Sequence, residues 1–382
     1  MQTAQRERGD MSGQGPRRAR RRGLHGWRLG LVIGLAVVVV LGGGTAAALG
    51  LGLLPNILPT TTPPESTPPP TTLPTLVPVP TLTPRPFWPL TGVPGDVVER
   101  PTLVVKVENS IDARPQQGLE DADIVWEEMV EAGITRYVAM FHSTLPEQIL
   151  PIRSIRPMDG PIAGWTGGLM VFSGGQEAFY ARARSDGLQL ISMDFGAAGF
   201  TRVKGRPSPH DVVGDPQIFL SQADANHQSS PPAFASFARP DRTTAVEAGA
   251  PASQVDVVIS SQGKPHWTWD ADSSRWLRFE GDKPAVTVDG TQLSAVNVLC
   301  LTVQVKSDSQ VDVNGVRVPE SIVVGSGAGL VATNGSTAII TWQKASETAP
   351  WQFFDAAGQP LVLAPGNTWV ELVPTTGSYL VS

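Results

Sequence analysis

The chain has almost none of the residues that form covalent crosslinks and metal sites. Its 382 residues include one cysteine, Cys300, and five histidines. A single cysteine cannot form a disulfide within the chain, and Cys300 lies in the apolar run 298–305, so we expect a small buried hydrophobic side chain there. No two histidines have the spacing of a zinc site. The sequence therefore predicts no metal site and no cofactor.

The folded part also lacks the positive charge that nucleic-acid binding requires. Residues 1–28 contain eight arginines and two acidic residues, a net charge of +6, whereas the whole chain carries −6. The rest of the chain therefore carries −12. Such an acidic body is unsuited to a phosphate backbone, so we expect no nucleic acid as a partner. The glycine-rich run 325–329 is not a phosphate-binding loop, because strand patterns rather than a helix follow it.

Charged residues are absent from residues 29–54. A helix of this length, rising about 1.5 Å per residue, is long enough to cross a hydrocarbon core of about 30 Å. The arginines just before it favour a cytoplasmic N-terminus. A cleaved signal peptide is the alternative, with small residues at 45–48 as its cleavage site. We predict a single-pass membrane protein with a transmembrane helix at 29–54, a cytoplasmic segment at 1–28 and extracytoplasmic folded domains.

Proline dominates the segment that follows. Residues 55–86 hold 12 prolines in 32 positions. Such a segment cannot form a hydrophobic core and tends to extend as polyproline II, with an upper reach on the order of 100 Å. We expect a linker that holds the folded part away from the membrane.

Beyond the linker, the sequence patterns predict an α+β fold. Apolar runs at 103–107 and 168–172, the second followed by a helix-like segment, predict an N-terminal α+β domain on a mixed sheet at 87–230. A stretch rich in Pro, Ala, Ser and Thr at 231–252 predicts a junction. Strand-like patterns continue through 253–382, which predicts a mostly β C-terminal domain.

Two local signals in the C-terminal part predict hairpins. The runs 266–269 and 275–279 flank a turn-like segment, and Asn334-Gly335 is typical of a type I′ turn. Six of the ten tryptophans of the chain also lie in this part. A tryptophan-lined strand face could stack sugars, although a packed core is the more typical use of this side chain.

A further hairpin is predicted in the most highly charged part of the chain. Residues 124–131 and 134–141 are apolar runs around Ala132-Gly133, and the first run alternates in position. A helix over 123–132, capped by the glycine, is the alternative.

Both alternatives bring two carboxylates to one face. In a helix, Glu127 and Glu131 are neighbours because they are four residues apart. In a hairpin with a two-residue turn, both fall on one side of the strand. Met129 then pairs with Arg136, and Arg136 joins the face of the two carboxylates.

We expect a ligand site around this pair. Arg153 and Arg156 could converge on an anion, and Arg114 is a third candidate of the same kind. Two prolines before His210 restrict its backbone, which suits a side chain that must be held in place. The alternative is that each residue forms only a local surface ion pair. The candidate ligand-binding residues are Asn109, Arg114, Glu127, Glu131, Arg136, Arg153, Arg156 and His210.

Short motifs in both halves resemble one bacterial family. The matching motifs are 89–92 (PLTG), Asn109, 113–119 (ARPQQGL), 122–125 (ADIV), 131–136 (EAGITR), 151–156 (PIRSIR), 209–210 (PH), 297–298 (NV), 325–327 (GSG), Gly335, 341–342 (TW) and 365–369 (PGNTW). Together they resemble the YerB-like lipoproteins, whose two halves are catalogued as domains of unknown function. The resemblance implies an extracytoplasmic protein and no particular reaction. Lipoproteins need a cysteine at the end of the signal sequence, and this chain has none there, so a transmembrane anchor would replace the lipid.

These observations favour a non-enzymatic envelope protein that binds an anionic or glycan-containing ligand, with a cell-wall or envelope polymer as its partner. One alternative is a wall-glycan hydrolase in which Glu127 and Glu131 share the acid and base roles, which requires carboxylates roughly 5–10 Å apart in a cleft. The other alternative is a scaffold that recruits an envelope protein through the tryptophan-rich C-terminal domain.

Overall fold

The computed structural model describes residues 86–239, 244, 249–312 and 315–382. The expected cytoplasmic segment, the expected membrane helix at 29–54 and all but the last residue of the expected linker lie outside the described residues. Val79–Ser382 forms one compact unit, so the two halves of the folded part belong to a single body.

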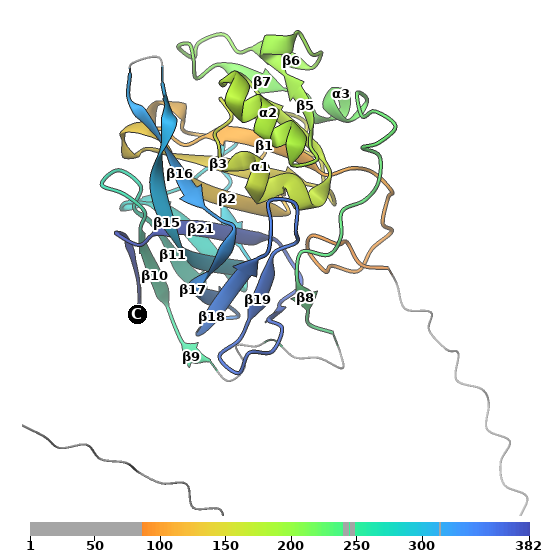
Figure 1. The fold of residues 1–382 in the computed structure, drawn as a ribbon. Helices are drawn as coiled ribbons and strands as arrows, with labels where there is room; N and C mark the ends of the chain where they lie inside the picture. The colour runs from red at the N-terminus through yellow and green to blue at the C-terminus, as the bar shows by residue number, and fades with distance from the viewer. Residues whose placement is uncertain (1–85, 240–243, 245–248, 313–314) are drawn as a thin grey trace, which may run out of the picture. The chain divides into compact units, whose positions relative to one another are not determined.

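Twelve strands form one mixed sheet through the molecule (Figure 1). Its order is β19-β18-β17-β15-β21-β2-β3-β1-β4-β5, with β16 paired to β15 and β9 to β18. The bounds are β1 Leu103–Glu108, β2 Ile124–Met129, β3 Thr135–Phe141, β4 Leu169–Phe172, β5 Gln189–Ser192, β9 Ala250–Pro251, β15 Asn297–Val311, β16 Arg317–Ile322, β17 Gly325–Thr333, β18 Ser336–Lys344, β19 Gln352–Phe354 and β21 Thr368–Pro374.

A second sheet has six strands in the order β13-β12-β11-β10-β22, with β14 paired to β12. Its strands are β10 Gln254–Val258, β11 Pro265–Asp270, β12 Arg275–Glu280, β13 Lys283–Pro284, β14 Ser294–Ala295 and β22 Ser378–Val381. Two further pairs join β6 Phe200–Arg202 to β7 Val212–Gly214, and β8 Ser236–Phe237 to β20 Val362–Leu363.

The helices of the described part are few and short. The α-helices are α1 Asp159–Ala163, α2 Glu177–Ser185 and α3 Pro216–Leu220. The 3₁₀ turns are η1 Ile111–Ala113, η2 Leu119–Asp121, η3 Glu131–Gly133, η4 Gly164–Thr166 and η5 Met193–Phe195. The expected α+β fold on a mixed sheet is confirmed in outline, and the described part is richer in sheet than in helix.

Local sequence explains several of these elements. The valine-rich run at β1 forms the expected strand. Asp215 starts α3, because its Oδ1 accepts the backbone N–H of Gln217 at 2.9 Å and that of Ile218 at 3.2 Å. Asn334 and Gly335 adopt φ values of 50° and 67° between β17 and β18, as the expected type I′ turn requires.

The two halves of the sequence are joined within the large sheet. β21, from the C-terminal half, lies parallel to both β2 and β15, and its residues Thr368 to Glu371 pair with Ile124 to Glu127. A parallel pair cannot be closed by a tight turn, so a long stretch of intervening chain connects these strands. The large sheet therefore contains strands from both halves of the chain, paired across a long separation in sequence.

Hydrophobic side chains form a core on each face of the large sheet. On one face, Trp126 packs in a cluster with Phe179 of α2, and Figure 1 shows α1 and α2 on this side. On the other face, Val125 and the buried Cys300 pack in a cluster with Trp267 of the small sheet. Full burial of such a side chain contributes about 1.5–3 kcal/mol of transfer free energy, so burial holds the three layers together.

The hairpin of β2 and β3 forms as expected, but its register differs by one residue from the expected register. The backbone N–H of Val130 donates to the carbonyl of Ile134 at 2.8 Å, which leaves three residues in the turn instead of two. Met129 therefore pairs with Thr135, and Arg136 pairs with Glu128. Because a slip of one residue reverses the facing of every side chain, Arg136 lies on the opposite face from Glu127. The expected shared face is wrong, and so is the alternative helix over 123–132.

Because the halves share one sheet, neither is expected to fold alone. Residues 86–239 without the rest would expose the edge of β2 and remove Trp351, whose ring centre lies 4.5 Å from that of Trp126. We expect this fragment to aggregate or to show no cooperative unfolding, and co-expression with residues 249–382 to restore a soluble complex. Solubility and urea unfolding followed by tryptophan fluorescence measure this. A monomeric fragment that unfolds cooperatively would contradict the expectation.

Candidate functional site

The end of β1 places two polar residues on opposite faces of the large sheet. Glu108 pairs with Arg136 of β3 and lies on the helix-covered face. Asn109 follows and points toward the small sheet, because side chains alternate along an extended chain. β1 also runs parallel to β4, and the C-terminal ends of parallel strands are a common place for ligands.

Glu108 is the acceptor on which the first group of side chains converges. Its Oε2 lies 2.8 Å from Nδ1 of His210 and 3.2 Å from Nε of Arg153. Its Oε1 accepts a hydrogen bond from Oγ of Ser110 at 3.0 Å. The side chain of Glu108 is buried, whereas those of His210 and Arg153 keep 16% and 18% of their surface exposed. One buried carboxylate therefore holds an imidazole and a guanidinium at the surface.

Two more arginines complete what we call the arginine cluster, which consists of Arg136, Arg153, Arg156, Glu108, Glu131 and His210. Nε of Arg156 lies 2.8 and 2.9 Å from the two carboxylate oxygens of Glu131. Arg136 donates from Nη1 to the carbonyl of Ser154 at 2.9 Å, but its Nε has no hydrogen-bond partner among the described residues. Burial and the charges of Arg156 and Arg153 lower the pKa of Arg136 to about 9. Three guanidinium groups thus share two carboxylates.

A buried triad lies beside this cluster on the same face. Nζ of Lys106 contacts Glu128 and lies 2.7 Å from Oδ1 of Asp159, and all three side chains are fully buried. Oδ2 of Asp159 accepts the backbone N–H of Arg156 at 2.6 Å, which ties the triad to the cluster. Burial, and then the charge of Asp159, raise the pKa of Glu128 to about 8. With Glu128 protonated near neutral pH, the triad carries no net charge.

A second group lies on the other face, between the two sheets. Nη2 of Arg278 lies 2.5 Å from Oε2 of Glu127 and 2.8 Å from Oε1 of Glu280. Its Nη1 lies 2.8 Å from Oε1 of Glu371. The guanidinium carbon also lies 4.6 Å from the ring centre of Trp369. Such stacking adds cation–π attraction at a fully buried guanidinium.

Protonation balances the charge of this second group. Burial, and then the charge of Glu127, raise the pKa of Glu371 well above its ordinary range, which favours the neutral acid. Burial would lower the pKa of Arg278, but its acidic neighbours raise it well above the ordinary value. Two carboxylates, Glu127 and Glu280, then face the guanidinium of Arg278, and Arg114 supplies the second positive charge at 3.0 Å from Oε2 of Glu280.

Asn109 connects this group to β1. Its Nδ2 donates to Glu127 at 3.1 Å and to Oγ1 of Thr135 at 2.8 Å. Its Oδ1 accepts from Nε of Arg114 at 3.0 Å, and its carbonyl accepts from Nη2 of the same arginine at 3.0 Å. The resulting Arg278 network consists of Arg278, Glu127, Glu280, Glu371, Asn109 and Arg114.

The eight candidate residues therefore fall into two groups on opposite faces of one sheet. Arg136, Arg153, Arg156, Glu131 and His210 meet in the arginine cluster, and Asn109, Arg114 and Glu127 meet in the Arg278 network. The two carboxylates expected to act together have different arginine partners. Glu127 is fully buried and bonded, so this conformation offers a polymer no access to it.

Lys106, Arg278 and Glu371 were not predicted as site residues, although the sequence contains a signal for each. Lys106 interrupts the apolar run of β1, and a charge there must find a buried partner. Arg278 alternates with Trp276 along β12, which places both on the buried face. Glu371 is the one charged residue in β21, and every residue of that strand is buried. The tryptophans of the C-terminal half also pack inward, and Trp267, Trp276, Trp342 and Trp369 are almost fully buried.

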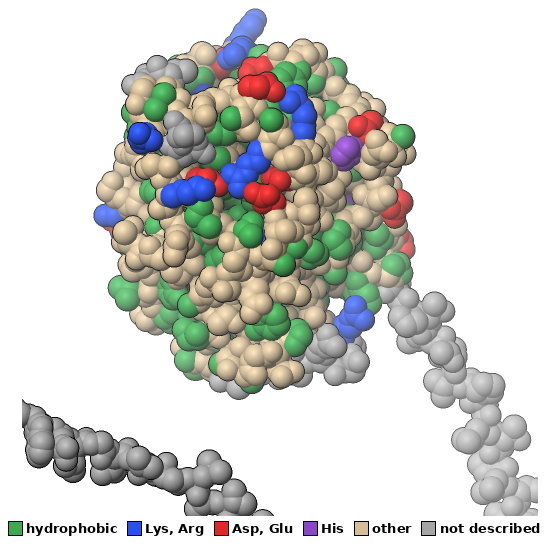
Figure 2. All heavy atoms as spheres, viewed as in Figure 1, with side chains coloured by type: hydrophobic (Ala, Val, Ile, Leu, Met, Phe, Trp, Pro, Cys, Tyr) green, Lys and Arg blue, Asp and Glu red, His purple; other side chains and the backbone are tan. Residues whose placement is uncertain are grey.

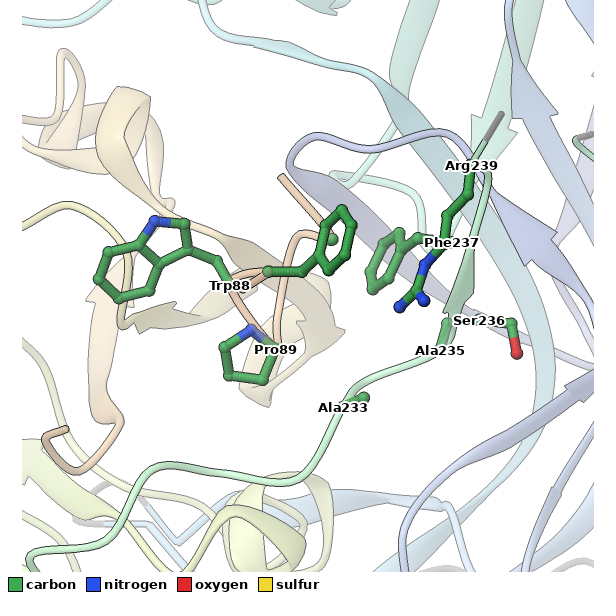
Figure 3. A pocket seen from close by; sticks show the side chains of 9 residues that line it. Trp88, Pro89, Ala233, Ala235, Ser236, Phe237 and Arg239 are labelled. Carbon is green, nitrogen blue, oxygen red and sulfur yellow. The ribbon is translucent and has the colours of Figure 1, made fainter. Parts of the chain in front are cut away.

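Two hollows lie in the described surface near these elements. One, of about 500 Å³, borders the Arg278 network at Arg114, Tyr137 and Glu280. The other, of about 460 Å³, lies between Trp88, Phe237 and Arg239 (Figure 3) and contains no candidate residue. On the face shown in Figure 2, acidic and basic side chains are interspersed rather than gathered in a patch of one sign.

Comparison with known proteins identifies the family. The model described as "Protein of unknown function (DUF3048) N-terminal domain" matches residues 90–229, and the corresponding C-terminal domain matches residues 255–370. The chain belongs to the DUF3048 family. It is 25% identical over 305 residues to "Putative lipoprotein YerB" of Bacillus subtilis, covering 77% of this chain and 88% of that one. The expected resemblance is confirmed.

A solved structure of this family shows the same fold. The crystal structure of the YerB protein from Bacillus subtilis superposes with a TM-score of 0.66 at 22% identity, covering 78% of this chain and all of the other. In the described part of this DUF3048 protein, no helix is long and apolar enough to cross a membrane. That part also contains no group of three His, Cys, Asp or Glu residues placed to hold a metal ion.

Removing the guanidinium of Arg278 is expected to destabilise the fold strongly. Arg278→Met keeps an unbranched stem but leaves Glu127 and Glu280 buried without their main cation, which typically costs about 3–5 kcal/mol. Urea unfolding measures the free energy of unfolding. Arg184→Met, at an exposed arginine paired with Glu177, is the control and should change stability little. A decrease in the free energy of unfolding of less than about 1 kcal/mol for Arg278→Met would show that the Arg278 network does not stabilise the fold.

Glu128 is expected to make stability depend on pH. Its folded pKa of about 8 lies above the ordinary 4.5, so its contribution is complete below pH 4.5 and is lost as the pH rises through 8. Glu128→Gln mimics the protonated acid and removes this dependence. The variant should therefore gain stability relative to the parent between pH 5 and pH 8, by on the order of 3 kcal/mol. The free energy of unfolding of both proteins is measured by urea denaturation at pH 5 and at pH 8. The same change between the two pH values in both proteins would show that the pKa of Glu128 is not raised.

Proposed function

We propose that this protein is an extracytoplasmic, membrane-tethered envelope protein that binds an anionic ligand at the arginine cluster. An uncharged run at 29–54 after a basic segment supports the tether. A relative of the same family carries the name of a lipoprotein, which supports a location at the outer side of a membrane. Because Cys300 is the only cysteine, a spanning helix rather than a lipid holds this chain.

One observation carries the ligand proposal. Arg136 is buried, and its Nε has no hydrogen-bond partner within the described residues. An unpaired buried donor on a charged group is costly, and the neighbouring guanidinium groups of Arg153 and Arg156 add repulsion. An anion bound at Arg153, whose side chain keeps 18% of its surface exposed, would offset this repulsion. Burial first, and then the charges of Arg156 and Arg153, lower the pKa of Arg136.

The surroundings of the cluster also favour an anion. The loop between β4 and α2 lies against the segment that carries the arginines, and a Cβ at Gly174 would lie 3.0 Å from Oγ of Ser154. The backbone N–H of Ile155 donates to the carbonyl of Gly174 at 2.9 Å. The N-terminus of α2 therefore begins beside the cluster, and its dipole adds positive potential.

The test compares polymers of different charge. We expect the full-length protein to bind a purified phosphodiester wall polymer, with an affinity that falls as salt is raised, and to bind a neutral glycan of similar length weakly. Arg153→Gln should weaken binding of the anionic polymer by about tenfold, because a charge-assisted hydrogen bond is lost. Sedimentation with the polymer or calorimetry measures the affinity.

The control is Arg184→Gln, which removes an exposed arginine outside the cluster. It should bind as the parent does. Equal binding by the Arg153→Gln and parent proteins, with both folded, would exclude the arginine cluster as the site. Equal affinity for the neutral glycan would instead show that the ligand is recognised by its sugars.

A further inference from the structure

The hollow that borders Arg114, Tyr137 and Glu280 lies on the other side of the large sheet from the arginine cluster. It has a volume of about 500 Å³ and lies between η1 and the hairpin of β12 and β13. Its lining includes Ile111 and Pro115 from the first half of the chain and Pro284 and Val286 from the second half. This volume is within the range of about 300–1,000 Å³ that is typical of ligand sites. Neither half of the chain forms it alone.

The rim of this hollow exposes aliphatic side chains. Ile111 is 80% exposed and Val286 is 36% exposed. The backbone N–H of Val288 donates to the carbonyl of Gln116 at 2.8 Å, so both strips of chain are held beside each other. Exposed aliphatic groups around a concave site mark a surface that gains free energy when an apolar group covers it.

The deepest lining residues are polar. The hydroxyl of Tyr137 donates to Oε1 of Glu280 at 3.1 Å. Glu280 is already paired with Arg278 and Arg114, so it does not repel an incoming anion as a free carboxylate would. These polar groups at the floor disfavour a long acyl chain, which would have to cover them without a hydrogen bond. A short apolar group that touches only the walls fits this arrangement.

Two cations stand at the edge of the hollow. Arg114 keeps 28% of its side chain exposed while Asn109 and Glu280 fix its position. Lys283 is exposed and has no ion-pair partner among the described residues, and the neighbouring Asp282 is the one unpaired acid of the lining. The lining therefore balances two cations against two acids, and the exposed ammonium of Lys283 next to apolar walls is the group that can meet a carboxylate beside an apolar side chain.

We propose that this hollow binds the C-terminus of a partner peptide, with its last apolar side chain against the aliphatic walls and its α-carboxylate at Arg114 and Lys283. The polar floor limits the apolar part to about one side chain. Nε and Nη2 of Arg114 already bond to Asn109 and Glu280. An incoming carboxylate would therefore accept from Nη1 of Arg114 and from Lys283, and its charge favours a chain end over a backbone amide. This site is separate from the arginine cluster and does not depend on the ligand proposed there.

Calorimetry with short peptides tests the assignment. The probe is acetyl-Ala-Ala-Leu with a free carboxylate, titrated into the full-length protein, and the same peptide with a C-terminal amide is the comparison. We expect saturable binding of the acid and about tenfold weaker binding of the amide, because the amide loses the charged contact. Equal affinities for acid and amide, or no saturable binding of the acid at millimolar peptide, would overturn the proposal.

Two surface variants test the walls and the edge without endangering the fold. Ile111→Ser and Lys283→Gln should each weaken binding of the acid by about fivefold, the first through lost apolar contact and the second through lost charge. Ile339→Ser, at an aliphatic residue that is 59% exposed on β18, and Lys264→Gln are the matched controls and should bind as the parent does. Unchanged binding by Ile111→Ser would overturn the proposed walls.

Two further measurements separate this site from other ligands. Octanoate offers a carboxylate on a long acyl chain, and we expect it to bind more weakly than the peptide. Tighter binding of octanoate would assign the hollow to fatty acids and overturn the peptide. Arg153→Gln should leave peptide binding unchanged, whereas a loss would show that the peptide occupies the arginine cluster instead.

Discussion

The guanidinium group of Arg278 joins the two sheets at the centre of this protein. It contacts Glu127 and Glu371 from two neighbouring strands of the large sheet, and it comes from β12 of the small sheet. A buried arginine is stable only when nearly all its donors are used, so the sheets can pack in one relative position. Tyr137 and Trp369 surround the group and exclude water from it. Glu280, which lines the hollow beside Arg114, is held in place by its ion pair with Arg278.

The large sheet separates the charges of the first half into two sites with different properties. On the helix side, positive charge exceeds the carboxylates that face it, and Arg136 keeps an unused donor. On the other side, the charges balance once Glu371 is protonated. Balanced charges rigidify a fold, whereas an excess of one sign attracts a ligand. Glu108 and Asn109, adjacent in sequence, each serve one of these sites.

Much of the local structure could be predicted from sequence, and the site only in part. The strand at β1, the hairpin of β2 and β3 and the turn at Asn334 follow from patterns within a few residues. The number of residues in the turn at Ala132 could not be read from the pattern, because two- and three-residue turns both accept glycine there. That single residue decided whether Arg136 faces Glu127 or Glu128.

The sequence by itself determined which segments become strands, that Cys300 is buried, and which family the chain belongs to, because these depend on periodicity and on short motifs. The tertiary structure alone decided which carboxylate meets which guanidinium. Arg278 lies 151 positions from Glu127 along the chain, and no local pattern reports a contact of that range. Side chains so distant meet because β21 pairs with β2 and the small sheet packs against them, and both contacts join segments far apart in the sequence.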